Sequence, residues 1–412
     1  MSTLEDLLVG GARGGQALVL GLVAVGCADA GPSRADGSVV RDSAGVAIVE
    51  SVDSVWGDDR WLLDAPSAVI GPPGTVFERV VGAERLRDGT VVVLDAGSGA
   101  LRWFDPQGEV RREVGRLGEG PDEFRTPAAL VETGGDTVAV WDSGSGAVVG
   151  WVDGVRVFRR VVARTGSGSP RAPLVFGDGY LLPFREGIGT RSVDGLGRHR
   201  FAAPVLAWWP GSDDADTLAF IPSEEFMTME VAGRPAIGVP PFMLQTGFAA
   251  SEGAWYVADA APRVDAAGRS WGQIDRRDAS GGIERILRLP AVRGRVSDAD
   301  RESYLALVQE RSGAPPEMAA ALARALIFPE WHPAFGALEV DPSGHLWIHA
   351  GAVHRPLPVE GPWRVIDPEG RWLGTVAMPD GFEPLSFSED HLTGVHRDPL
   401  GVESVWVLPI VR

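Results

Sequence analysis

The sequence has 412 residues but contains no lysine and no asparagine, so all 38 of its basic side chains are arginine. The absence of lysine excludes a Schiff base, a lysine general base and the phosphate-binding loop that ends in Gly-Lys. The absence of asparagine excludes N-linked glycosylation, because the acceptor motif begins with Asn. It also removes Asn from the set of possible metal ligands.

Positive charge is scarce relative to negative charge. The formal net charge is −18 at pH 7, whereas nucleic-acid binding needs concentrated Lys and Arg. The same acidity disfavours electrostatic adhesion to anionic lipid. Beyond the first 27 residues, no apolar run is long enough to form a membrane span. We therefore expect no nucleic-acid partner.

Cysteine occurs once, at Cys27, directly after the apolar segment 17–26. A segment of about ten apolar residues that ends in small residues is typical of a secretory signal peptide. Ala24-Val25-Gly26-Cys27 resembles a bacterial lipobox, which implies that the Cys27 thiol carries a diacylglycerol. The alternative is an ordinary signal peptide with an incidental cysteine. We expect a signal peptide over residues 1–27 with lipid attachment at Cys27.

The segment after Cys27 is small and polar. Residues 28–44 show no periodicity, and we expect them to form a flexible tether. Residues 45–412 then remain for a folded domain, which has no disulfide and depends on its hydrophobic core.

One stretch of this domain repeats itself. Residues 88–105 return as residues 135–152, each copy comprising a turn, an apolar run, an Asp-Gly turn and a second apolar run. Strand-based self-similarity of this period is typical of propeller blades. The identical pairs are Thr90/Thr137, Val91/Val138, Val93/Val140, Asp95/Asp142, Gly97/Gly144, Ser98/Ser145, Gly99/Gly146 and Ala100/Ala147.

Six blade-like units can be placed along the chain. Two strands of the repeat, Val91–Leu94 and Val138–Trp141, are apolar at successive positions, which indicates burial on both faces. We predict an all-β, six-bladed propeller, with Val46–Val52 and Trp61–Ile70 completing the last blade. The units lie near residues 86–114, 130–162, 177–208, 253–287, 341–376 and 392–408.

A helical insertion interrupts the strands over residues 297–327. Ser297-Asp-Ala-Asp300 predicts a capped helix start, and Pro316 predicts the start of a second helix. We expect an αα-hairpin that packs on the rim, the alternative being a lid over a pocket.

Three motifs resemble bacterial six-bladed propeller proteins related to NHL repeats. They are Val114–Phe124, which resembles a G-x-x-G-x-G-P-G-E-F signature, Pro333–Phe335 together with Asp341–Ile348, and Arg397–Glu403. The resemblance covers residues 45–412 and implies an exported propeller, often a lipoprotein, without an established activity. Asp122 replaces a usual Gly, and Gly97-Ser98-Gly99 replaces a usual Asn, so this turn must be held in another way.

Asp95, Asp142 and Asp259 directly follow apolar strands at equivalent blade positions. A ring of such carboxylates could bind Ca²⁺, but recurrence in each blade favours turn aspartates that accept backbone N–H groups. Six histidines lie near the C-terminus without a carboxylate motif, and we predict no metal site. These histidines are His332, His345, His349, His354, His391 and His396.

The remaining candidate motifs have mainly structural interpretations. Gly268–Gly272 matches G-x-S-x-G but lacks the strand-to-helix context of a nucleophile elbow. The loop Gly118–Pro121 could present N–H groups to a ligand, but it more simply forms a tight crossing between blades. Trp208 and Trp209 face opposite sides of a strand, so one of them could be exposed and recognise a sugar or a protein, but we favour core positions for both.

These observations predict a membrane-anchored propeller in the bacterial cell envelope, facing the periplasm or exterior. We expect a monomer that binds a small molecule or an envelope protein, with no catalytic residue and no cofactor assigned. The first alternative is a metal-dependent hydrolase or lyase of the gluconolactonase or streptogramin-lyase type, with its site in the central funnel. The second is a structural assembly factor.

Overall fold

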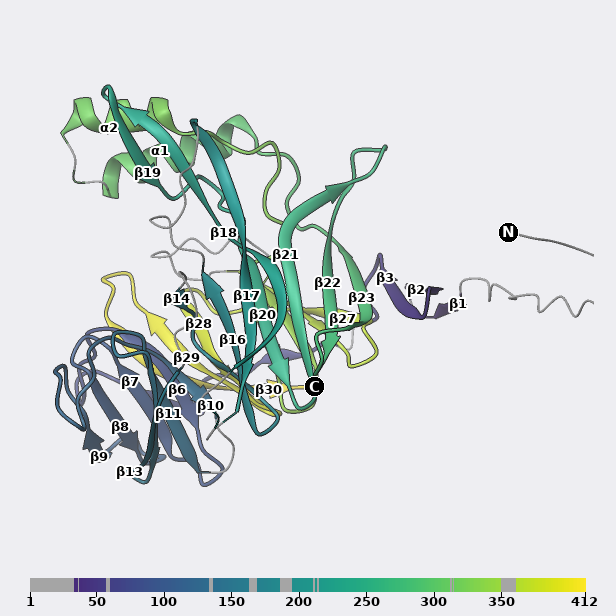
Figure 1. Cartoon of the computed structure of the whole chain (residues 1–412). Coiled ribbons are helices and arrows are strands. Elements are labelled where there is room, and N and C mark those ends of the chain that lie inside the picture. Colours follow the sequence, from purple (N-terminus) through teal and green to yellow (C-terminus); the bar gives the residue numbers. More distant parts are fainter. Residues whose placement is uncertain are drawn as a thin grey trace, which may run out of the picture. The chain divides into compact units, whose positions relative to one another are not determined.

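Six sheets, each containing antiparallel strands that follow one another in the chain, make up the fold. The computed structural model describes residues 33–35, 37–56, 60–132, 136–162, 169–185, 195–209, 212, 215–311, 313, 315–349 and 361–412. These residues belong to the unit Pro32–Arg412. The predicted signal peptide and Cys27 lie outside them. The strand pairing confirms an all-β, six-bladed propeller (Figure 1).

The first two blades contain the repeat found in the sequence, and each has four strands. Blade one is β6 (Val80–Arg85), β7 (Val91–Asp95), β8 (Ala100–Phe104) and β9 (Val110–Val114). Blade two is β10 (Pro127–Glu132), β11 (Thr137–Asp142), β12 (Ala147–Val152) and β13 (Val155–Val161).

The middle blades are larger, because several of their strands extend beyond the usual length. Blade three is β14 (Ser169–Pro170), β15 (Leu174–Phe176), β16 (Gly179–Arg185), β17 (Gly197–Trp208), β18 (Asp216–Val231) and β19 (Arg234–Gly238). Blade four is β20 (Thr246–Ser251), β21 (Ala254–Val264), β22 (Ser270–Asp278) and β23 (Ile283–Pro290).

The last two blades follow the helical insertion. Blade five is β24 (Leu338–Val340), β25 (Leu346–His349), β26 (Trp363–Ile366) and β27 (Trp372–Val376). Blade six is β28 (Phe382–Phe387), β29 (His391–Arg397) and β30 (Glu403–Val411), completed by β4 (Leu62–Leu63) and β5 (Ala68–Ile70).

Apolar side chains from neighbouring blades form the core. Every residue of β7 is buried, as the run of apolar residues predicted. Between blades one and two, Leu94 and Trp103 pack in one cluster with Val140 and Trp151. The first strands contact each other in turn from β6 through β10, β15, β20 and β24, and β28 contacts β6. The ring therefore closes between the sixth and first blades.

The N-terminal strands follow a different path from the one the sequence predicted. Trp61–Ile70 does complete the last blade, since Ala68 pairs with Val407 and Leu63 with Ile410. The prediction for Val46–Val52 was wrong. Strand β3 (Val46–Ser51) instead pairs in parallel with β23 at the outer edge of blade four. Any strand edge without a neighbour can accept a further strand, so the sequence of Val46–Val52 alone does not show that it joins β23.

Residues between β3 and β4 continue along the neighbouring blade. The N–H groups of Val55 and Trp56 donate to the carbonyls of Trp372 and Leu373 in β27, at 3.0 and 2.7 Å. The segment 46–70, which we call the strap, thus pairs with the outer strands of blades four, five and six in succession. Gly374 permits the close approach of the Trp56 ring, which a Cβ atom at that position would overlap.

Pairing also begins earlier than residue 45. Strand β1 (Ser33–Ala35) pairs with β2 (Ser38–Ser43), and β2 pairs along its length with β3. Both strands lie within residues 28–44, where the sequence indicated a flexible tether. The predicted boundary of the domain at residue 45 is therefore too late.

The helical insertion has the predicted form, with α1 (Asp298–Arg311) followed by α2 (Pro316–Ala325). Figure 1 shows both helices at the end of the molecule toward which the long strands β17 and β18 extend, and α2 contacts β18. Ser297 and Asp300 form the reciprocal cap: the Asp300 N–H donates to Ser297 Oγ at 3.1 Å, and the Ser297 hydroxyl donates to Asp300 Oδ2 at 2.6 Å. Neither helix is long and apolar enough to cross a membrane.

The insertion is attached to the blades by the Asp300 side chain, which contacts Arg293 and His332, and by several aromatic rings. His332 Nε2 lies 3.1 Å from Asp300 Oδ2, and the His332 side chain is buried. The Phe242 ring contacts His332 at 4.5 Å between centroids and Tyr304 at 5.5 Å. Arg198 of β17 donates to the carbonyl of Ile327 at 3.0 Å. These contacts hold α1 and α2 at the ends of blades three and four.

Asp300 makes this attachment pH-dependent. Hydrogen bonds from the hydroxyl and N–H of Ser297, and then the His332 ring, lower the pKa of Asp300. A carboxyl with a lowered pKa in the folded state stabilises the fold above its unfolded pKa, and this stabilisation is lost as the pH falls. We predict that α1 amides lose protection from hydrogen exchange as the pH drops below about 4, and that Asp300→Asn removes part of this protection at pH 7.

The control for this prediction is Glu302→Gln, which changes an exposed carboxylate on the same helix. It should leave the protection of α1 unchanged at pH 7. Equal protection of α1 in wild type and Asp300→Asn would show that the charged Asp300 side chain does not hold the insertion.

Candidate functional site

Two of the three aspartates singled out in the sequence are turn residues. Asp95 Oδ1 accepts the N–H of Arg79 at 2.9 Å, and Asp142 Oδ1 accepts the N–H of Thr126 at 2.7 Å. In both blades the N–H of the preceding residue donates to the other carboxylate oxygen, at 3.3 and 3.2 Å. Both carboxylates are buried. Each therefore fastens the start of a first strand to the end of a second strand.

The turn that lacks the usual Asn is held by serine. The Ser98 hydroxyl donates to Asp95 at 2.8 Å, and the Ser145 hydroxyl donates to Asp142 at 2.6 Å. Burial raises the pKa of Asp95. Hydrogen bonds from the Ser98 hydroxyl and from the N–H groups of Arg79, Glu78 and Gly97 outweigh burial, so the pKa of Asp95 is lowered. The carboxylate form is thus the one that the fold requires.

Asp259 occupies the equivalent position in blade four but has a different environment. It pairs with Thr246 at the start of β20, as Asp95 pairs with Val80 in blade one. Its side chain is 43% exposed, and Oδ1 accepts Arg200 Nη1 at 2.5 Å and the N–H of Ala261 at 3.0 Å. The sequence pattern did not distinguish it from the two buried aspartates.

A glutamate from the neighbouring blade takes over the turn function. The N–H of Leu244, just before β20, donates to Glu225 Oε2 at 3.0 Å. Glu225 lies on β18 and is held by two hydrogen bonds from Arg198, at 2.8 and 2.6 Å. Asp259 therefore keeps the bond to the N–H of Ala261 but does not hold the residues before the first strand of its blade, as Asp95 and Asp142 do.

The Asp259 carboxylate lies in a groove between blades three and four with a volume of about 380 Å³. Strand β18 contributes apolar side chains, and β21 and β22 contribute most of the polar ones. Two carboxylates, two guanidinium groups and one amide line it, which provides both donors and acceptors. The lining residues are Phe220, Ile221, Pro222, Val257, Asp259, Ala261, Pro262, Arg263, Gln273, Asp275 and Arg277.

Asp275 and Arg277 form the polar wall of this groove. Arg277 Nη2 lies 3.3 Å from Asp275 Oδ2, and Gln273 Nε2 donates to Asp275 Oδ1 at 2.9 Å. Arg277 also donates to the carbonyl of Gly281 at 2.8 Å, whereas its Nε is buried without a hydrogen-bond partner. The Arg263 guanidinium lies over the Trp271 ring at 5.5 Å. The side chains of this wall therefore hold one another in position, and Arg277 Nε has no acceptor among the described residues.

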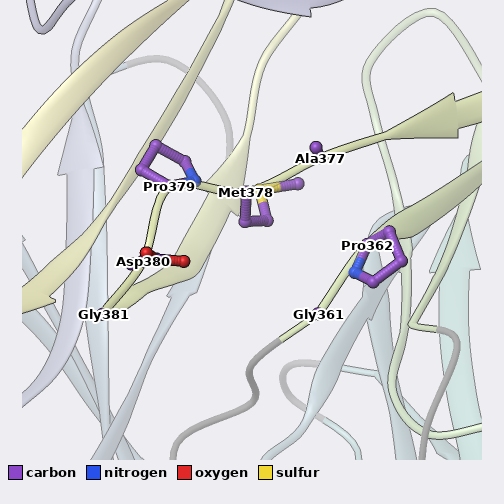
Figure 2. Close-up of a pocket in the computed structure, with 7 residues that line it drawn as sticks. All are labelled: Gly361, Pro362, Ala377, Met378, Pro379, Asp380 and Gly381. Carbon is purple, nitrogen blue, oxygen red and sulfur yellow. The ribbon is translucent and has the colours of Figure 1, made fainter.

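A second cavity of about 340 Å³ lies between blades five and six. Figure 2 shows Gly361 and Pro362 on one of its segments and Ala377–Gly381 on the other. Asp380 is the single ionisable side chain among its lining residues, which otherwise offer backbone, proline and one methionine. This cavity therefore offers a ligand fewer polar side chains than the groove does. Neither cavity is lined by the first strands of the blades, where the sequence analysis placed a funnel site.

The described histidines are paired individually rather than grouped. His345 Nδ1 lies 3.0 Å from Asp341, and His391 Nδ1 lies 2.6 Å from Asp390. His396 stacks on Trp406 at 3.8 Å, and His349 lies beside Trp363. Among the described residues, no three His, Cys, Asp or Glu side chains come together as a metal site would require. His354 lies outside these residues, and the metal-dependent alternative stays a prediction.

Apart from Trp209, the other sequence motifs have the structural roles that the sequence favoured. Ser270 begins β22 after the turn at Gly268, so it does not lie on a nucleophile elbow. In the loop Gly118–Pro121, the N–H of Gly120 donates to Glu123 at 2.8 Å. Trp208 is buried, and Trp209 is 39% exposed. The core position that the sequence favoured is confirmed for Trp208 and wrong for Trp209.

The residues around Glu225 were missed in the sequence. Arg198 and Arg200 are spaced two apart on β17, and Glu224 and Glu225 are adjacent on β18. Two arginines at a strand spacing of two share one face, so the pattern Arg198-His-Arg200 was an available signal. The sequence did not show which residues would pair with these arginines, because Pro222 and the two glutamates made the segment of β18 a poor candidate for a strand.

Comparisons with known proteins give structural likenesses at low identity. No protein-family model matches the chain, and no curated protein matches it. A structure from Bacteroides fragilis, described as an exported protein, has a TM-score of 0.44 at 11% identity, covering 88% of this chain and 99% of its own. The relation to NHL-repeat proteins and to lipoproteins stays a prediction.

Two enzymes are also among the similar structures. A gluconolactonase from Xanthomonas campestris has a TM-score of 0.36 at 15% identity, covering 82% of this chain and 88% of its own. An inactive virginiamycin B lyase from Staphylococcus aureus has a TM-score of 0.39 at 9% identity, covering 85% of this chain and 100% of its own. The six-bladed fold of this chain rests on its own strand pairing.

The different roles of the aspartates predict different losses of stability. Asp142→Ala removes a buried carboxylate and leaves two partly buried N–H groups and a serine hydroxyl without this acceptor, and we expect it to lower the free energy of unfolding by about 2–4 kcal/mol. Asp259→Ala breaks a partly exposed ion pair and should cost about 1 kcal/mol or less. Urea unfolding followed by tryptophan fluorescence measures both. Equal losses in the two variants would contradict the assignment of Asp259 to the groove.

Proposed function

We propose that this protein is an extracytoplasmic, lipid-anchored β-propeller that binds a ligand in the groove between blades three and four. It acts as a monomer whose ligand is a small molecule or a segment of an envelope protein. The proposal includes no catalytic step. A propeller suits this role, because its blades hold the loops and strands around a site in fixed positions.

The departure of Asp259 from the repeated turn structure carries this proposal. In blades one and two the equivalent carboxylate is buried and holds backbone N–H groups just before the first strand together with a serine hydroxyl. In blade four Glu225 replaces it, and Asp259 is exposed beside Arg200 and the groove. A carboxylate with a structural role accepts its hydrogen bonds from the protein itself. An exposed carboxylate in a groove can also accept hydrogen bonds from a ligand.

The lining indicates the kind of ligand. Phe220 is 68% exposed at the groove, and Pro262 adds further apolar surface. Opposite charges lie side by side in Asp275 and Arg277. Such a mixed surface suits a small, polar molecule with both donor and acceptor groups and an apolar part, because polar groups orient a ligand and apolar contacts retain it.

Loss of the polar wall should remove the ligand. We expect the full-length protein, purified gently from its own membranes, to carry a small molecule detectable by native mass spectrometry. Asp275→Ala and Arg277→Ala should each reduce its occupancy at least tenfold, which corresponds to about 1.4 kcal/mol of binding energy.

Asp380→Ala provides the matched control, since it removes a carboxylate from the cavity between blades five and six. It should retain the molecule at wild-type occupancy. If all three variants carry the molecule equally, or if it is lost only with Asp380→Ala, the groove is not its binding site.

Anchoring at Cys27 has a separate test. Labelling of cells with a palmitate analogue should mark the wild-type protein and not Cys27→Ser, because the thiol is the proposed attachment atom. The variant should also move from the membrane fraction to the soluble fraction. Equal labelling of the two proteins would end the lipoprotein proposal and leave the groove proposal untouched.

A further inference from the structure

A cluster of three arginines lies next to the groove, on the side of the first strands of blades three and four. Arg171 follows β14, Arg185 ends β16, and Arg200 lies on β17. We call these residues the arginine cluster. Two of them, Arg171 and Arg185, converge on Glu224 of β18. None of Arg171, Arg185 and Glu224 lines the groove.

The two arginines share a single oxygen atom. Glu224 Oε1 lies 3.1 Å from Arg171 Nη2 and 3.2 Å from Arg185 Nε. A guanidinium normally binds a carboxylate through two parallel N–H groups, one to each oxygen. Glu224 therefore neutralises the arginines only in part and does not give either of them a bidentate partner.

Arg171 is the least satisfied member of the cluster. Its Nη1 donates to the carbonyl of Thr246 at 3.0 Å, and its guanidinium lies over the Phe248 ring at 5.5 Å. Nε and Nη2 are buried and have no hydrogen-bond partner among the described residues, although Nη2 is close to Glu224. Buried donors without acceptors are costly, particularly on a charged group.

Burial also makes the charge of Arg171 expensive. Burial is the main cause that lowers the pKa of Arg171 to about 10; the Glu224 carboxylate acts in the opposite direction, and the positive charges of Arg185 and Arg200 act in the same direction as burial. The like charges of the three arginines repel one another. A further negative charge at this position would relieve the repulsion.

Arg200 does not pair with Glu224, because its N–H groups donate to other acceptors. It donates to Asp259 at 2.5 Å, to Thr246 Oγ1 at 2.7 Å and to the carbonyl of Ser223 at 2.7 Å. Among the described residues, three guanidinium groups thus face two carboxylates, those of Glu224 and Asp259. This pairing leaves one positive charge in excess within the described part of the cluster.

The cluster is accessible from one side. The Arg185 side chain is 54% exposed, Glu224 is 25% exposed and Arg171 is 17% exposed. A ligand would meet Arg185 first and reach Arg171 by displacing the Glu224 carboxylate. Glu224 can move toward solvent without leaving another described arginine unpaired, because Arg200 does not depend on it.

We infer that the arginine cluster is a binding site for an oxyanion, a carboxylate or phosphate group of a small molecule, that replaces Glu224 on Arg171 and Arg185. In the unliganded protein Glu224 serves as an internal substitute for the anion. The site is separate from the groove and does not require the groove to bind anything. Arg200 and Asp259 connect the two places, so one larger ligand could also span them.

Isothermal titration of the full-length protein tests this inference. Inorganic phosphate and acetate are titrated separately at constant ionic strength, with chloride as the reference anion. We expect saturable binding of at least one of them. Arg185→Gln should weaken it at least tenfold, because one charge-assisted contact is lost. Glu224→Gln should strengthen it severalfold, since the neutral amide competes less well for the arginines.

The Glu224 variant separates a binding site from a structural ion pair. A purely structural Glu224 would give a less stable protein with no gain in anion affinity. Arg159→Gln, which removes an exposed arginine from β13, should bind the anion as wild type does. Asp275→Ala should do so as well, because Asp275 belongs to the groove alone.

The two anions distinguish the source of the charge. Binding of phosphate alone assigns the site to a phosphate group, and binding of acetate assigns it to a carboxylate. No saturable binding of either anion would overturn the inference. Binding that Arg185→Gln leaves unchanged, or that Asp275→Ala abolishes, would equally overturn it and place the anion elsewhere.

Discussion

The ring of blades depends on hydrogen bonds between strands from opposite ends of the described chain. Ala68 and Ile70 pair with Val407 and Val405, so residues near 70 complete a blade that ends near residue 411. Behind this pairing, Phe77 and Val80 share a cluster with Val395 and Val405. Without closure, one face of blade one and one face of blade six would expose their apolar side chains to water. The strap extends the same closure along blades five and four.

Blade three is where the ring departs most from regularity, and the candidate sites follow from this. Strands β17 and β18 are longer than their counterparts in blades one and two. Their extra length places Glu224 and Glu225 beside the start of blade four. Glu225 caps the backbone there in place of Asp259, and Glu224 meets Arg171 and Arg185. Arg198 links the same strands to the helical insertion.

Much of the architecture could be predicted because it depends on local patterns. Runs such as Val91–Leu94 predict strands buried on both faces, and Ser297 with Asp300 predicts a helix start. The same reasoning correctly favoured a turn role for Asp95 and Asp142. It failed for Asp259, whose local sequence resembles theirs, because its role depends on Glu225 in another blade. It also failed for Val46–Val52, since the sequence of a strand does not indicate which open sheet edge it joins.

The sequence by itself determined the blade count, the turns and the helical insertion, because each is a property of neighbouring residues and of a hydrophobic pattern that must be buried. It likewise excluded lysine chemistry and internal disulfides through composition alone. Only the tertiary structure decided which carboxylates are used by the backbone and which are exposed to a ligand. The physical reason is that a carboxylate is satisfied by whichever donors reach it, and at blades three and four those donors come from strands far apart in the chain.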